Sequence, residues 1–201
     1  VMDDLETAGL AFGRLSAQFI RDKVVPELDA FRFASYCGIS GVTKKEETLA
    51  DGAATVAALS AAVTAMDDEE VTATGRYLFI TPTLLQGIND MDTTKSKKVL
   101  EGFEQVIKVP QRRFYTAIKQ LSGKTGEEAG GYTKAAGAAN INFAIVQKDA
   151  LIQYTKHAAP KIIAPENNPD ADAYVFGYRM VGIAKAYKNM LSGMYFSHDK
   201  A

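Results

Sequence analysis

Residues 2–38 read MDDLETAGLAFGRLSAQFIRDKVVPELDAFRFASYCG, and this stretch decides the fold. Its apolar side chains recur at steps of three and four residues, which is the period of one face of an α-helix. They are Leu5, Ala8, Phe12, Leu15 and Phe19, followed after a small shift in phase by Val24, Leu28 and Phe31. At about 1.5 Å per residue the helix would be roughly 50 Å long, about twice the width of a domain of this size. We therefore expect a rod that extends beyond its own domain.

The ends and the middle of this rod carry their own signals. Asp3 and Asp4 stand where a carboxylate can cap free amides, and Gly38 stands where a left-handed C-cap is expected. Pro26 lacks an amide proton and presses on the preceding turn. We therefore expect a kink there, or two helices that share an axis.

The bulk composition is that of a soluble globular chain. The 201 residues are 47% hydrophobic and 23% charged, which suits one large or two small domains. The net charge of −1 gives no overall basic field, so composition does not indicate bulk binding to nucleic acid. Cys37 is the single cysteine, which fits a reducing compartment, and no apolar run or signal peptide predicts a membrane segment or export. Because the chain begins with Val1 rather than methionine, we expect upstream sequence to have been removed.

The next part of the chain predicts a mixed α/β layer. Alanine-rich residues 49–66 form a second helix, and 76–81 and 103–109 form strands that are closed by Pro82 and Pro110. A short apolar turn follows Pro82. The basic group Lys95, Lys97 and Lys98 lies between the two strands and is interpreted as an exposed loop.

The second half predicts loops and long strands. Residues 122–137 contain five glycines and are interpreted as a mobile surface loop, 141–147 as a strand, and 161–164 as the start of another before a turn at 165–172. Residues 173–187 form a long strand whose two faces are both apolar, so both faces must be covered. Residues 188–193 then supply a hairpin turn, and 194–197 return antiparallel to the long strand.

Side chains that usually carry catalysis or bind metals are few and scattered. His157 lies in a polar segment and His198 lies near the end of the chain, each without a partner at helical spacing. Cys37 has no nearby histidine and is interpreted as a buried, inert thiol. The acidic pair in residues 90–92 lacks the rest of a calcium loop, and no zinc motif is present in the sequence. We therefore predict no catalytic, cofactor-binding or metal residue, no cofactor, and no enzymatic activity.

One fragment resembles a nucleotide-binding motif. Ser122, Gly123, Lys124 and Thr125 copy the tail of a phosphate-binding loop. The full motif requires a glycine at position 118, where this chain has isoleucine, and a strand before the loop, where 114–121 favours a helical turn. A nucleotide-dependent enzyme that uses Gly123, Lys124 and Thr125 therefore remains an alternative function, from a different class of protein. A long rod, an apolar strand and scattered reactive groups together favour a chain that binds copies of itself.

Five segments, taken in order, resemble the major capsid protein family of tailed bacteriophages. The rod resembles the spine helix of that family, in which a VVPE-D-[AY]-[YF]-R-[FY] run recurs. The segments are AGLAFGRLSAQFIRDKVVPELDAFRFA (8–34), RYLFITP (76–82), VIKVPQRRF (106–114), INFAIVQKDA (141–150) and YRMVGIAKAYKNMLSGMYF (178–196). The resemblance spans nearly the whole chain.

The resemblance implies an α+β fold, the phage major capsid fold, with a long spine helix, peripheral β-strands and an axial mixed α/β domain. Residues 1–45 and 157–201 would form the peripheral domain and 46–156 the axial domain. In the axial domain, residues 119–137 would hold loops near the capsomer axis. In the peripheral domain, the turn 165–172 would reach toward neighbouring capsomers. The N-terminal arm and extended loop of the family are missing here, so we expect a trimmed core that assembles poorly. The family's lysine–asparagine crosslink is not expected, since its lysine belongs to that loop and 173–179 contains no glutamate.

The function implied is that of a structural subunit of a tailed-phage or prophage icosahedral capsid. It would assemble with itself into pentamers and hexamers of a shell that encloses packaged DNA without sequence readout. Scaffold, portal and protease proteins would be further partners, and no membrane is involved. The chain would be made in the bacterial host cytoplasm and located in the virion. An encapsulin-type compartment shell, which shares the fold, is the nearest alternative.

Overall fold

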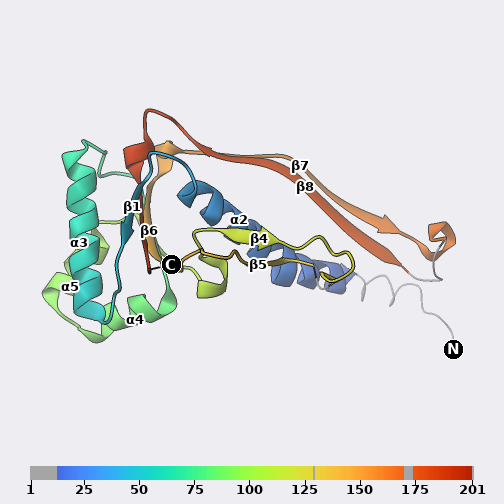
Figure 1. Cartoon of the computed structure of the whole chain (residues 1–201), viewed down its shortest axis with the longest axis horizontal. Coiled ribbons are helices and arrows are strands. Elements are labelled where there is room, and N and C mark those ends of the chain that lie inside the picture. Colours follow the sequence, from blue (N-terminus) through green and yellow to red (C-terminus); the bar gives the residue numbers. More distant parts are fainter. Residues whose placement is uncertain (1–12, 129, 170–173, 201) are drawn as a thin grey trace.

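A computed structural model of the chain describes residues 13–128, 130–169 and 174–200. Residues 13–19 are helical, and the helices that follow are the π-helix η1 (Ile20–Val24), α2 (Val25–Cys37), α3 (Gly52–Asp68), α4 (Pro82–Asp90) and α5 (Thr94–Glu101), with 3₁₀ turns η2 (Gln111–Arg113), η3 (Lys148–Ala150), η4 (Pro165–Asn167) and η5 (Leu191–Gly193). The strands are β1 (Thr43–Glu46), β2 (Arg76–Ile80), β3 (Gln105–Lys108), β4 (Ile118–Gln120), β5 (Tyr132–Lys134), β6 (Ile141–Gln147), β7 (Leu151–Ile163), β8 (Val175–Ala186) and β9 (Met194–His198). Figure 1 shows a body of sheet and helices at one end, from which the rod and a long hairpin extend. The predicted α+β class is confirmed.

The body is built on a five-stranded mixed sheet with the order β1-β9-β6-β2-β3. Strand β6 is antiparallel to both β2 and β9, and the outer pairs β1–β9 and β2–β3 are parallel. All seven residues of β6 are buried, as expected for a strand that is covered on both faces. The prediction that 194–197 return antiparallel to 173–187 is wrong, because β9 pairs with β6 and β1. Residues 194–197 are fully buried there, which a free hairpin edge would not allow.

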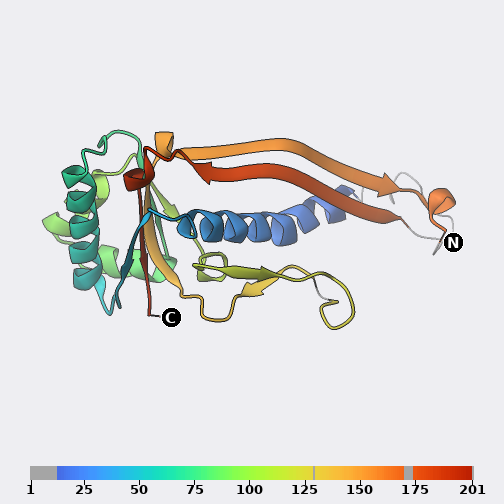
Figure 2. The ribbon, with the colours of Figure 1, turned by 45° about the horizontal axis from the view of Figure 1, so that its top comes forward.

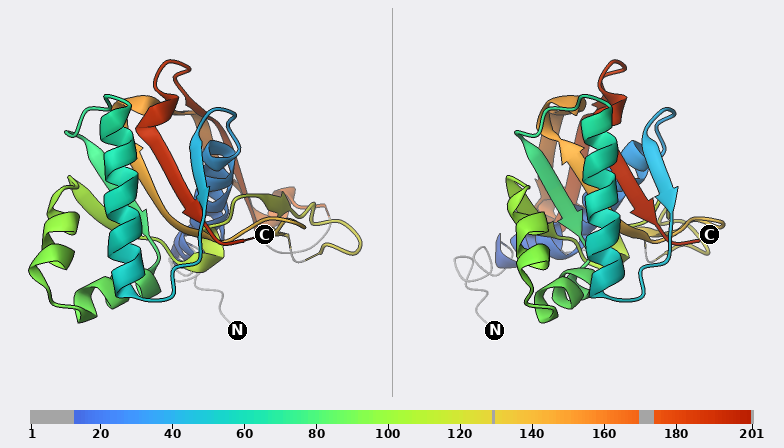
Figure 3. Two further views of the ribbon diagram at one scale, coloured as in Figure 1. Left: turned by 60° about the vertical axis from the view of Figure 1, so that its left-hand side comes forward. Right: turned by 90° about the vertical axis from the view of Figure 1, so that its left-hand side faces the viewer.

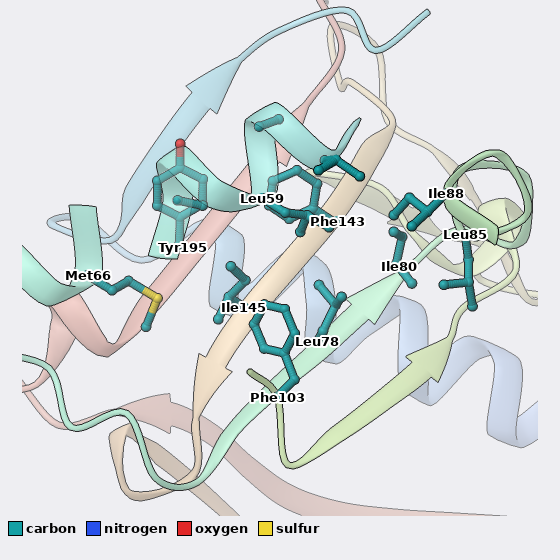
Figure 4. Packing of buried hydrophobic residues seen from close by; sticks show 13 residues of the cluster. Leu59, Met66, Leu78, Ile80, Leu85, Ile88, Phe103, Phe143, Ile145 and Tyr195 are labelled. Carbon is teal, nitrogen blue, oxygen red and sulfur yellow. The ribbon is translucent and has the colours of Figure 1, made fainter. Parts of the chain in front are cut away.

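Helices α3, α4 and α5 cover one face of this sheet (Figure 3). Helix α3 confirms the second predicted helix, and its N-terminus is capped by the Asp51 carboxylate, which accepts a hydrogen bond from the Ala54 amide at 2.7 Å. Helices α3 and α4 approach closely at Gly52, where a Cβ atom would collide with the carbonyl oxygen of Gly87. Figure 4 shows the side chains that fill this layer, namely Leu59, Met66, Leu78, Ile80, Leu85, Ile88, Phe103, Phe143, Ile145 and Tyr195 among others.

The C-terminal half of the rod covers the other face of the sheet. Phe33 of α2 makes edge contacts with the rings of Phe79 and Phe114, at centroid distances of 5.3 and 4.7 Å. Phe114 is fully buried, and so is Met194 on β9. This second core attaches the rod to the sheet at one end only, so the first turns of the rod extend past the body.

The described part of the rod confirms the predicted helix over residues 13–37. Residues 1–12, with Asp3, Asp4, Leu5, Ala8 and Phe12, lie outside the described residues. Pro26 sits in the first turn of α2 and the turn before it is the π-helix η1, so the break falls where it was predicted. Figure 2 shows the rod bending between its first turns and α2. Gly38 does not adopt the predicted left-handed conformation, since its φ is −71°, and its amide donates to the Ala34 carbonyl oxygen. In the turn that follows, Gly41 is the glycine with a left-handed backbone.

The hairpin β7–β8 runs along the rod, away from the body (Figure 2). It pairs Leu151 with Ala186 at its base and Ile163 with Val175 near its tip, and the register shifts between Thr155 and His157. The long strand predicted at 173–187 is confirmed as β8, while residues 170–173 lie outside the described residues. The strand that pairs with β8 is β7. A strand was predicted to start at residue 161, and β7 in fact begins at Leu151.

Several local predictions need correction. The basic residues 95, 97 and 98 lie on helix α5, whose capping box at Thr93 and Ser96 starts a helix where a loop was expected. Residues 118–120 form strand β4 rather than a helical turn, and β5 lies inside the predicted 122–137 loop because the two strands pair with each other. The predicted strands 76–81, 103–109 and 141–147 are confirmed as β2, β3 and β6. The division into 1–45 with 157–201 and 46–156 stays a prediction.

Candidate self-association surface

The large hydrophobic side chains that remain exposed gather on two elements. Every one of them in the described part of the chain lies on the rod, on the β7–β8 hairpin or directly beside the hairpin. They are Leu15, Phe19, Val25 and Phe31 on the rod, and Tyr154, Ile162, Tyr174, Val175, Val181, Ile183 and Tyr187 on or beside the hairpin. Exposed apolar residues that gather in this way mark surfaces that bind other molecules, whereas singly scattered ones do not.

The hairpin turns one face toward the rod, which we call the inner face. Phe176, Tyr178 and Met180 of β8 are half-buried on it, and the Phe176 ring contacts the Phe19 ring edge-on at 5.8 Å. Rod and hairpin do not close on each other completely. An open groove of about 580 Å³ remains between them, lined by Phe19, Val24, Leu28, Phe31, Met180 and other residues of α2 and β8. The lining is mainly apolar, and Glu27, Arg32 and Gln120 are its charged and polar residues.

A few polar contacts position the rod against its neighbours. The Tyr36 hydroxyl donates to Oε1 of Gln153 on β7 at 3.3 Å. The Arg113 guanidinium pairs with the Asp29 carboxylate at 3.2 Å, which links α2 to η2. Near the groove, the Gln120 amide of β4 donates to the Glu27 carboxylate at 3.0 Å. These contacts link the rod to β7, to η2 and to β4.

The far side of the hairpin, which we call the outer face, is a mixture of apolar and cationic side chains. Cross-strand partners share a face, so the register places the pairs Tyr154–Ile183 and His157–Val181 on it, and Val181 and Ile183 also border the groove. Val175, Val181 and Ile183 keep 42, 41 and 47% of their surface exposed. The cover that was predicted for both faces of this strand is therefore incomplete in a single copy of the chain.

The two histidines and the cysteine do not come together. His157 is exposed on the outer face, and His198 ends β9, where its Nδ1 lies 2.8 Å from the carbonyl oxygen of Asp199. Cys37 is 2% exposed at the end of α2, and burial raises the pKa of its thiol although Lys44 lowers it in part. The predicted buried thiol is confirmed, and the protonated form of the thiol is favoured.

The Gly123, Lys124 and Thr125 segment forms an exposed turn between β4 and β5. A phosphate-binding loop leads into a helix whose free amides receive the phosphate, but here the chain continues into a strand. The Glu127 carboxylate accepts hydrogen bonds from the Ser122 amide and hydroxyl and from Lys119 at 2.6 to 2.9 Å. These donors lower the pKa of Glu127 to about 2, the Lys119 contact most strongly. The protein's own carboxylate thus takes the amide that a phosphate would use.

Other site types find no support in the described ranges 13–128, 130–169 and 174–200. Within them, no three histidine, cysteine, aspartate or glutamate side chains lie close enough together to hold a metal ion. Lys97 of the basic group is paired with Asp92 at 2.6 Å. None of the helices in the same ranges has both the length and the apolar character needed to span a membrane.

The sequence predicts strand β8 but does not predict the surface that this strand helps to form. The missing part was β7, because LIQYTKHAAP (151–160) shows no apolar alternation. The available signal was the absence of acidic residues from 151 to 163, which stands out in a chain of net charge −1. The groove could not be predicted, since it arises from how the hairpin is placed against the rod.

Solved structures that resemble this chain come from phages. A structure from Mycobacterium phage Che8 matches 93% of the chain with a TM-score of 0.58 at 10% sequence identity. The capsid structure of cyanophage P-SCSP1u matches 87% with a TM-score of 0.49 at 17% identity. The chain spans 62% of the length of the first and 60% of the second. No protein-family model and no curated protein matches the sequence. The likeness to the Che8 structure shows a shared fold.

Proposed function

We propose that the chain is a structural subunit of a phage or prophage capsid, a member of the major capsid protein family of tailed bacteriophages. The observation that carries this proposal is the gathering of exposed hydrophobic side chains on the rod and hairpin. A shell subunit must present apolar surface to its neighbours after it has folded, and this chain does so on its two most extended elements. The fold shared with the Che8 phage structure and the five ordered sequence segments support the same proposal.

The proposed mechanism is repeated self-association without chemistry. In a closed shell each subunit would use one surface against the neighbour on one side and a different surface against the next, which generates rings when the rotation closes. Each contact needs only modest strength, because a subunit in a shell makes several at once. The shell would enclose DNA in a virion, and scaffold, portal and protease proteins would act during assembly.

The test is the assembly state of the full-length protein. Sedimentation of the intact protein, made in a bacterial host, is expected to show rings or closed particles many times heavier than the 21.7 kDa of this chain. Treatment with nuclease followed by DNA extraction then separates a shell that encloses DNA from a compartment that encloses protein. Full-length protein that sediments as a monomer at every concentration tested would contradict the proposal.

A further inference from the structure

The outer face of the hairpin has a one-sided charge. Strands β7 and β8 contain Lys156, Lys161, Arg179 and Lys185 and no aspartate or glutamate. Because the whole chain has a net charge of −1, the remaining residues together carry −5. The register places Lys161, Arg179 and Lys185 on the outer face, and all three are exposed. Within the described residues none of these three forms an ion pair.

This pattern selects one kind of partner. Two copies of the outer face would repel each other, since like charges would meet without a carboxylate between them. A nucleic acid would neutralise the cations, but interfaces with DNA are polar and would leave Val181 and Ile183 without apolar contacts. A protein surface that offers carboxylates beside apolar groups would satisfy both features of the outer face.

The chain itself offers such a surface at the C-terminal end of α3. Asp67, Asp68, Glu69 and Glu70 are consecutive and exposed, and Asp67 is paired with the buried Arg76 at 2.7 Å. The other three form no ion pair in the part of the chain that the structure describes. The negative end of the helix dipole adds to their charge. The turn is held in place by the hydrogen bond from the Val71 amide to the Met66 carbonyl oxygen at 3.0 Å.

Beside this turn lies a shallow pocket of about 140 Å³. Its lining holds Glu69 and Glu70, the apolar residues Val71 and Met190, and the polar residues Thr72, Gln147, Asn189 and Ser192. Lysine and arginine side chains bury a hydrocarbon stem and keep a charged head near the surface, so an opening of this kind suits one of them. A cation of the outer face could therefore enter it with its stem on the apolar lining and its head at the two carboxylates.

We propose that the outer face of the hairpin docks on a second copy of the chain, with a cation of the outer face, most centrally Arg179, in the pocket beside Glu69 and Glu70. The proposal rests on the function proposed above and adds the partner surface to it. The two surfaces differ, so the contact is heterologous, and one copy can give its hairpin to one neighbour and receive the hairpin of another. The remaining apolar residues of the outer face would be covered in the same contact.

The test is a charge swap in the full-length protein, read by sedimentation velocity over a range of concentrations. The double variant Glu69→Lys with Glu70→Lys, and separately Arg179→Glu, should each raise the concentration needed for half-assembly by about tenfold or more. The combined variant should recover most of that loss, because the charges again attract. Glu101→Lys and Lys98→Glu change exposed charges on α5 and should leave assembly at the wild-type level.

Circular dichroism melts of every variant separate a lost contact from a lost fold. Recovery in the combined variant supports the pairing. Assembly at the wild-type level in either partner variant overturns the pairing and leaves the proposed function standing. Loss of assembly in both charge-swap variants, without recovery in the combined variant, also overturns the pairing. If Arg179→Glu instead lowers only the DNA content of intact particles, the outer face contacts DNA and the inference is wrong. A wild type that never assembles overturns the proposed function together with the inference.

Discussion

Replacing the two apolar side chains at the centre of the outer face should weaken assembly while leaving the subunit folded. The change is Val181→Thr together with Ile183→Thr, which keeps both side chains β-branched and suited to a strand. In the single subunit these side chains keep 41 and 47% of their surface exposed. Complete burial of such a side chain is worth about 1.5–3 kcal/mol, so covering the exposed half contributes about 1 kcal/mol each. Losing both amounts to about 2 kcal/mol per contact, or about 30-fold in the association constant.

The assay is sedimentation velocity of the full-length protein from well below to well above the assembly concentration. The double variant is expected to need about 30-fold more protein for half-assembly, while its free energy of unfolding falls by no more than about 2 kcal/mol, the worth of the share of both side chains that is already covered within one copy. Ala57→Ser with Ala61→Ser, on the exposed side of α3, serves as the matched control. Assembly of the threonine variant at the wild-type concentration would refute the reasoning. So would a loss of subunit stability well above about 2 kcal/mol, since it would show that these side chains contribute more within one copy than their buried share explains.

Three further predictions concern the subunit itself. Phe114→Ala removes a fully buried ring that contacts Phe33 at 4.7 Å and should lower the free energy of unfolding by about 3–5 kcal/mol in a urea titration, whereas Phe31→Ala, at an exposed position, should cost under about 1 kcal/mol. The Glu127 carboxyl should titrate by NMR with a pKa of about 2, below its ordinary 4.5, so its stabilising effect is complete above pH 4.5 and is lost as the pH falls toward 2; Lys119→Ala should move this pKa upward, and an unmoved pKa would contradict the assigned contact. Cys37 should react with a thiol reagent at pH 8 only as fast as the protein unfolds, since it is buried and its thiol pKa is raised; rapid reaction in the native state would contradict its burial.

The elements that the sequence predicted well are those whose pattern depends on near neighbours. The period of Leu15, Phe19, Leu28 and Phe31 predicts the rod because a helix brings residues three and four apart onto one face. The runs 76–81 and 141–147 predict β2 and β6 because branched and aromatic side chains crowd into short segments. Pro26 marks the break in the rod for a local reason as well, the loss of one amide donor.

The predictions that failed concern pairings between distant segments. Residues 194–197 follow a turn after β8, and local reasoning pairs them with β8, but burial of all four between β1 and β6 is the alternative that the fold adopts. Strand β7 could not be recognised from its own residues, because it is polar and becomes a strand by pairing with β8 over its whole length. Helix α5 was missed because its three lysines suggested a loop, although Thr93 and Ser96 form a capping box.

The sequence predicted that this chain binds copies of itself, but it did not predict where the surfaces for this contact lie. The apolar pattern of residues 173–187 predicted a strand that must be covered on both faces, and it did not indicate which element covers each face. The groove beside Phe31 and Met180 and the acidic pocket beside Glu70 both depend on tertiary placement. Spacing along the sequence holds no information about either.

The most direct test of the central claim is an electron cryo-microscopy map of the full-length protein. We expect rings or closed particles in which Tyr154, Val181 and Ile183 of one copy lie against a neighbouring copy. Maps that contain only monomers, or particles in which the outer face of the hairpin is open to solvent, would contradict it.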